Sequence, residues 1–92
     1  MIYILRFVEG EQYLSMIKKS IQFNSVNEIK DFVYTTMTQR FDIDLISGRY
    51  VADAKSILSV FGLDLGSEVT LGIHADEKEA SAYLGKIDKY LV

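Results

Sequence analysis

The sequence predicts an α+β fold: an open-faced β-sandwich, in which helices cover one face of an antiparallel sheet. Segments in which apolar and polar residues alternate, as in half-buried strands, are interleaved with segments whose apolar residues recur at helical spacing. The 92 residues, 49% of them hydrophobic, suffice for one compact core but are too few for two domains. Because the chain contains no proline, glycine, asparagine, aspartate and serine mark the boundaries between segments.

Four strands are expected from period-two alternation. The first covers residues 16–23, where Lys19 is the one residue that breaks the pattern of Ile17, Ile21 and Phe23. The segments "FDIDLI" and "RYVAD" alternate on either side of Ser47 and Gly48, a pair that permits a tight hairpin. The segment "EVTLGI" is the fourth strand.

A long helix is predicted over residues 26–39, opened by the segment "SVNE". In the expected capping box, the Ser25 hydroxyl accepts from the N–H of Glu28, and the Glu28 carboxylate accepts from the N–H of Ser25. The apolar residues at helical spacing form one stripe that packs on the sheet: Val26, Ile29, Phe32, Val33 and Met37.

Two more helices complete the order strand, helix, strand, strand, short helix, strand, helix. The short helix lies between Ser56 and Gly62, and we expect Gly62 to end it in the left-handed conformation. The last helix has Asp76 as its N-cap and Glu79 three residues on. Its apolar residues keep helical spacing: Ala80, Tyr83, Leu84, Ile87 and Leu91.

The first fifteen residues have two interpretations. In one, "MIYILRFV" is an added strand that "EGEQ", with Gly10, turns back along "YLSMIKKSIQF" to make a long hairpin. In the other, Met16 is the true start and residues 1–15 are an upstream extension. The predicted division is therefore an N-terminal extension or added strand over residues 1–15 and a domain over residues 16–92.

Composition excludes several classes of protein. The absence of cysteine removes disulfides and thiolate metal sites and favours an intracellular protein. A net charge of -3 without a basic stripe argues against nucleic-acid binding. The longest apolar run, "IYILRFV", is too short to span a bilayer and contains Arg6, so a cytoplasmic protein without membrane contact is expected.

The sequence carries no recognisable catalytic or cofactor motif, so no enzyme, metal or cofactor is expected. The single histidine, His74, falls on the strand face opposite Val69, Leu71 and Ile73, with no partner cluster near it in sequence. Four aspartates lack the spacing of a calcium loop and are expected to be solvated charges: Asp42, Asp44, Asp53 and Asp64. No glycine-rich phosphate loop is present.

Ser56 admits two interpretations. As an N-cap, its hydroxyl accepts from first-turn N–H groups and contributes about 1 kcal/mol. A phosphate at the same position would lie at the positive end of the helix dipole, beside Lys55. It would also add charge to an apolar patch that a partner can recognise, made by Ile57, Leu58, Val60 and Phe61.

The segment "KSILSVFGLDLGSEVTLGIHADEKEA" resembles the second half of HPr, the phosphocarrier protein family of the bacterial phosphoenolpyruvate-dependent sugar phosphotransferase system. A Lys-Ser-Ile-Met-Gly-type segment opens a short helix in that family, a Gly-Xaa-Glu-Val-Thr-type strand follows, and an acidic capping stretch starts the last helix. The predicted element order over residues 16–92 is also similar. The resemblance implies the HPr type of open-faced sandwich.

The resemblance also shows what this chain lacks. Where the family has a phosphorylatable histidine and a neighbouring arginine, this sequence has Asn27 and Ile29 in "NSVNEIKDF". An amide cannot relay a phosphoryl group, and Ile29 offers no donor to phosphate oxygens. His74 is expected at the far end of the sheet and is no substitute.

What the resemblance retains is Ser56, which matches the serine that an ATP-dependent HPr kinase phosphorylates and a transcriptional regulator then recognises. One residue is inserted at Asp53-Ala54 relative to the family. The resemblance therefore implies a non-catalytic regulatory or interaction module whose protein partners include such a kinase and regulator. Two alternatives stay open: a working phosphocarrier with another acceptor, and a purely structural module in a complex. The oligomeric state is not predicted.

Overall fold

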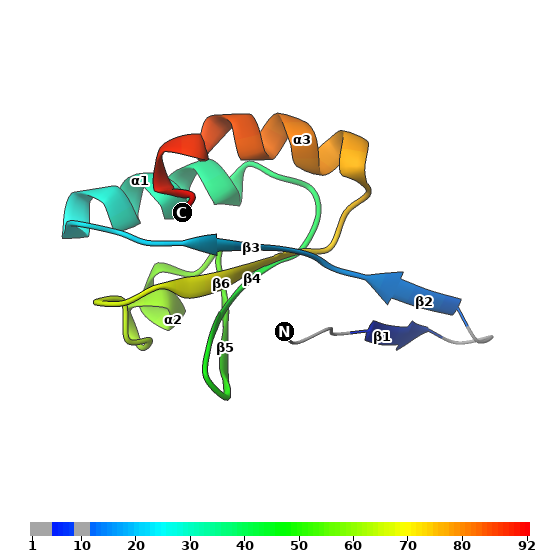
Figure 1. Ribbon diagram of the computed structural model, residues 1–92, viewed down its shortest axis with the longest axis horizontal. Coiled ribbons are helices and arrows are strands. Elements are labelled where there is room, and N and C mark those ends of the chain that lie inside the picture. Colours follow the sequence, from blue (N-terminus) through cyan, green and yellow to red (C-terminus); the bar gives the residue numbers. More distant parts are fainter. Residues whose placement is uncertain (1–4, 9–11) are drawn as a thin grey trace.

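The structure, a computed structural model, describes residues 5–8 and 12–92 (Figure 1). After two short strands, β1 and β2, the chain follows the predicted order of elements. In chain order these elements are β1 (Leu5–Val8), β2 (Gln12–Ser15), β3 (Ile17–Ile21), α1 (Val26–Met37), β4 (Ile43–Ser47), β5 (Tyr50–Asp53), α2 (Ile57–Phe61), β6 (Val69–Ile73), α3 (Glu77–Lys86) and the 3-10 turn η1 (Asp88–Tyr90).

A four-stranded antiparallel sheet has the strand order β3-β6-β4-β5. The helices α1 and α3 lie on the same side of this sheet (Figure 1). The predicted fold class, an α+β open-faced sandwich, is confirmed. No helix in the described part of the chain is long and apolar enough to cross a membrane.

The core lies between the sheet and its helices. Alternate strand residues point into it, as the period-two pattern predicts, and α1, α2 and α3 each contribute apolar side chains. The fully buried large side chains are Tyr83, Phe32, Ile21, Ile43, Leu45, Leu71, Ile73, Ile87, Val33, Val60 and Thr36. Only Thr36 among these is a short polar side chain, and its hydroxyl hydrogen-bonds the Tyr83 hydroxyl at 2.6 Å.

The predicted N-caps are present, with one difference. Ser25 Oγ accepts from Glu28 N at 3.2 Å, and Asp76 Oδ1 accepts from Glu79 N at 2.8 Å. The Glu28 carboxylate, however, accepts from Asn24 N at 2.8 Å rather than from Ser25 N. The backbone of Ser25 is extended (φ -159°, ψ 162°), and in this geometry the N–H one residue earlier meets the carboxylate.

The predicted left-handed Gly62 is wrong. Gly62 has φ -77° and ψ -8°, because the helical turn continues: Gly62 N donates to Ser59 O at 3.1 Å and Leu63 N to Val60 O at 3.1 Å. The left-handed glycine is instead Gly48, at φ 62°, in the turn between β4 and β5. A two-residue hairpin of this kind needs positive φ, which glycine adopts without strain.

The strands β1 and β2 form a separate antiparallel pair, with Leu5 opposite Ser15 and Val8 opposite Gln12. The antiparallel pairing that the hairpin interpretation expects is present between residues 5–8 and 12–15, in a sheet separate from the other four strands. The turn expected at Gly10 lies outside the described residues. That Met16 is the true start stays a prediction.

Candidate regulatory surface around Ser56

Ser56 is the N-cap of α2, as predicted. Its backbone is extended (φ -109°, ψ 110°), and its hydroxyl accepts from Ser59 N at 3.3 Å. Its own N–H donates to Asp53 O at 3.0 Å, so a turn fixes the chain just before the helix. The side chain is partly exposed. A modifying enzyme can therefore reach a serine whose backbone is held in place.

The five-residue helix α2 carries two apolar residues that pack on the core and two that face outward. Ile57 and Val60, three residues apart, pack against the core, and Val60 is fully buried. Leu58 and Phe61, also three residues apart, are 83% and 42% exposed. The prediction that Val60 belongs to a partner surface is therefore wrong, because the helical period of 3.6 residues turns it inward. We call Ser56, Leu58 and Phe61 the α2 surface.

Lys55 does not lie free beside Ser56. Its ammonium donates to the carbonyl oxygen of Gln39 at 2.8 Å, just beyond the end of α1. This contact ties the start of α2 to the C-terminal end of α1, where unpaired carbonyls favour a cation. A phosphate on Ser56 would have to compete with Gln39 for this ammonium.

Asn27 and Ile29, which the resemblance to HPr aligns with the histidine and arginine of that family, differ in exposure. Asn27 is exposed in the first turn of α1, whereas Ile29 is only 6% exposed and is part of the core. A side chain at position 29 therefore points under the helix, away from any group carried by Asn27. Position 29 therefore lacks a donor to phosphate oxygens and also directs its side chain into the core, away from Asn27.

Asn27 and Ser56 lie toward opposite ends of α1. Lys55, next to Ser56, contacts Gln39, and twelve residues of mostly helical chain separate Gln39 from Asn27, about 18 Å at 1.5 Å per residue. The structure therefore does not bring these two predicted positions together, and the α2 surface stands alone as the candidate site.

His74 has a partner that sequence reasoning missed. Its Nε2 lies 2.8 Å from Asp44 Oδ2, and its backbone N–H donates to Asp42 O at 2.9 Å. Asp44 is thirty residues away in the chain but belongs to the strand next to β6. The sequence alone does not show this contact, because it depends on the pairing of β4 with β6, which places alternate residues of the two strands on the same sheet face.

The position of His74 agrees with the sequence prediction. Ile73 pairs with Ile17 at the start of β3, and Val69 pairs with Ile21 at its end, from which the chain leads into α1. His74 thus lies at the end of the sheet remote from the opening of α1. Its side chain is only 5% exposed, which closes it to a phosphoryl donor as large as a protein.

The remaining aspartates act in local turns. Asp53 Oδ1 accepts from Lys55 N at 2.9 Å, and Asp64 Oδ1 accepts from Gly66 N at 3.1 Å. Across residues 5–8 and 12–92, no group of three or more histidine or acidic side chains is arranged to hold a metal ion.

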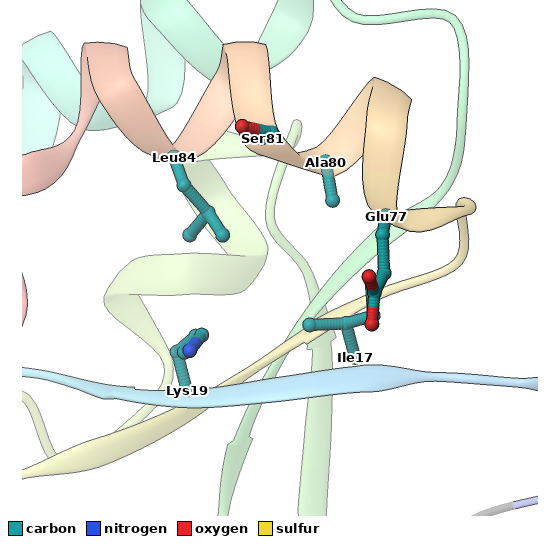
Figure 2. A pocket seen from close by; sticks show the side chains of 6 residues that line it. All are labelled: Ile17, Lys19, Glu77, Ala80, Ser81 and Leu84. Atoms are coloured by element: carbon teal, nitrogen blue, oxygen red, sulfur yellow. The ribbon is translucent and has the colours of Figure 1, made fainter.

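Lys19, which interrupts the apolar pattern of β3, lines a hollow between β3 and α3 (Figure 2). Its stem lies under Leu84, and Glu77 lies at the other end of the hollow, above Ile17 (Figure 2). Lysine is tolerated at this inward position because β3 is an edge strand and the ammonium can reach water.

No protein-family model and no curated protein matches this sequence.

Proposed function

We propose that this chain is a non-catalytic regulatory or interaction module of the HPr type, recognised by other proteins through the α2 surface and acting in the cytoplasm. The observation that carries this proposal is the position of Ser56: it caps the short helix α2, which exposes two apolar side chains, Leu58 and Phe61. Exposed apolar groups next to a modifiable hydroxyl form a surface whose charge a kinase can change.

The order of elements from β3 to α3 supports the likeness to HPr but does not by itself assign a function, because one fold hosts many functions. The lack of phosphoacceptor chemistry supports a non-catalytic role. Asn27 cannot relay a phosphoryl group, Ile29 is buried, and His74 is almost fully covered. These observations disfavour the alternative of a working phosphocarrier.

The test is incubation of the full chain with an HPr kinase and ATP, followed by intact mass measurement. The natural chain should gain one phosphate and Ser56→Ala none. Ser59→Ala is the matched control, because Ser59 is an exposed hydroxyl on the same helix whose backbone N–H survives the substitution. A chain that gains no phosphate, or a Ser56→Ala variant that gains as much, would contradict the proposal.

A second incubation separates the module from a phosphocarrier. With phosphoenolpyruvate and the first enzyme of the phosphotransferase system, the chain should acquire no acid-labile phosphate. Label that is stable in base and lost in acid would indicate a phosphohistidine and would overturn the non-catalytic assignment. A chain inert in both incubations fits the third alternative, a purely structural module in a complex.

A further inference from the structure

The two edges of the four-stranded sheet differ in how far other residues cover them. On the outer edge of β3, Val92 N donates to Ser20 O at 3.0 Å and Gln22 N to Tyr90 O at 3.0 Å, so the last residues cover part of this edge. β5 forms the other edge, and in the described part of the chain no strand pairs with its outer side. Edges without such a cover can pair with another chain.

Two neighbouring side chains of β5 are apolar and exposed. Tyr50 is 70% exposed and Val51 59%. The segment "RYVAD" contains neither proline nor lysine, the residues that commonly prevent pairing at an edge. Its remaining protections are its length of only four residues and the charges of Arg49 and Asp53 at its two ends, so a partner must complement these charges.

The backbone groups that face outward can be identified from the hydrogen bonds of neighbouring residues. Ala54 N donates inward, to Ile43 O at the start of β4, at 2.9 Å. Asp53 O faces the other way, because it accepts from Ser56 N. Directions alternate along a strand, so the N–H and C=O of Val51 point outward, into the open edge.

Charges at the two ends of this strand are antisymmetric about Val51. Arg49, in the turn before the strand, precedes Val51 by two residues, Asp53 at the end of the strand follows it by two, and both residues are exposed. We propose that β5 pairs antiparallel with β5 of a second copy of this chain, about a two-fold axis that passes beside Val51. The two Val51 residues then exchange two backbone hydrogen bonds, and the sheet continues from one copy into the other.

Charge complementarity indicates that the strand pairing with this edge belongs to a second copy of the chain. In this register the Arg49 side chain, which extends from the turn before β5, faces Asp53 of the other copy, and this pair forms twice because the contact is isologous. Tyr50 lies opposite Ala52, a large side chain opposite a small one. Opposite charges and β-branched pairs directly across a strand are favourable, whereas like charges are not.

The interface is small. A strand of four residues buries much less than the roughly 1,200–2,000 Å² that is typical of stable complexes, so the dimer should form only at high protein concentration. Sedimentation equilibrium over about 10 µM to 1 mM protein should therefore show a monomer that converts to a dimer. In the same range, the amide resonances of Val51 and Asp53 should shift more than those of α1.

Charge reversal tests the register. Arg49→Glu and Asp53→Lys should each weaken self-association about tenfold or more, because each change creates two repulsive pairs. An equimolar mixture of the two variants should associate as well as the natural chain. In the mixed dimer the two introduced side chains, glutamate and lysine, face each other, and the natural Asp53 of one copy faces the natural Arg49 of the other. Failure of the mixture to associate would overturn the register.

A third variant distinguishes loss of dimerisation from loss of folding. Val51→Pro removes an N–H that points away from β4, so the monomer should melt at a temperature close to that of the natural chain while dimerisation is lost. A natural chain that stays monomeric at about 1 mM, or a Val51→Pro variant that folds and still dimerises, would overturn the proposal. These readouts do not depend on Ser56, so the result is independent of the proposed function.

Discussion

Thr36 on α1 and Tyr83 on α3 share a hydrogen bond of 2.6 Å, and both side chains are fully buried. The bond joins the two helices that lie over the sheet. Burial raises the pKa of Tyr83 well above its usual range, and the hydrogen bond to Thr36 lowers it by less. Each hydroxyl satisfies the other, so removing one leaves the other buried without this partner.

Tyr83→Phe should therefore lower the free energy of unfolding by about 1–2 kcal/mol, mainly through the unsatisfied Thr36 hydroxyl. Thr36→Val should have an effect of similar size. The double variant should lose less than the sum of the two, because no buried hydroxyl then remains. Urea denaturation of the four proteins measures these values, and strictly additive losses would contradict the coupling.

The raised pKa of Tyr83 predicts a loss of stability in alkali. The unfolded chain releases the phenolic proton near pH 10 while the folded chain keeps it, so ionisation stabilises the unfolded state above that pH. The stability contribution is complete below about pH 10 and falls as pH rises further. Thermal melts from about pH 8 to pH 11 should decline more steeply for the natural chain than for Tyr83→Phe; equal slopes would argue against the shift.

On α2, Val60→Ala should cost about 2 kcal/mol of stability, because Val60 is fully buried and its loss leaves a cavity. Leu58→Ala should change stability by less than about 0.5 kcal/mol, because Leu58 is 83% exposed. Under the proposed function, Leu58→Ala should instead slow modification of Ser56 by an HPr kinase. An unchanged rate of modification in Leu58→Ala would remove Leu58 from the docking surface.

Val60 and Leu58 of α2 show which parts of the fold and of the candidate site the sequence could predict and which it could not. Period-two and helical spacing predicted every element from β3 to α3 except α2, and most of the core, because burial on one face imposes those periods. The short helix α2 was placed only by the room between Ser56 and Gly62. The apolar residues of α2, which stand almost next to one another, cannot be divided into inner and outer faces without knowing how the helix is rotated on the core. Likewise, the partner of His74 depends on which strand lies beside β6, and Asp44 reaches it through a pairing distant in sequence.

Introducing the histidine or the arginine of the HPr family at the aligned positions should not create phosphotransfer. Asn27→His should fold normally, because Asn27 is exposed, yet acquire no appreciable phosphate from the first enzyme of the phosphotransferase system. Ile29→Arg should lose about 3 kcal/mol or more, because it forces a charge into the core. Phosphate uptake by Asn27→His alone would show that the alignment is wrong, or that an arginine at position 29 is not needed.

Amide exchange tests the N-terminal pair of strands. β6 has neighbours on both sides, whereas β1 and β2 are described only as a pair, and two-stranded sheets are marginally stable. Amides of residues 5–8 and 12–15 should thus be protected, but less than those of β6. Rapid exchange throughout these residues would support the interpretation that the protein starts at Met16.

The last prediction concerns Ser56 as a cap. Ser56→Ala should lower stability by about 1 kcal/mol, because Ser59 N loses its acceptor at 3.3 Å, whereas Ser56→Gly should cost only a few tenths. Phosphate oxygens can accept from the same N–H, so the phosphorylated chain should melt no lower than the natural chain. If phosphorylation instead lowers the melting temperature by several degrees, the added charge disrupts the start of α2 or the contact between Lys55 and Gln39. Ser56 would then act by loosening this end of the helix rather than by presenting a charge on an intact surface.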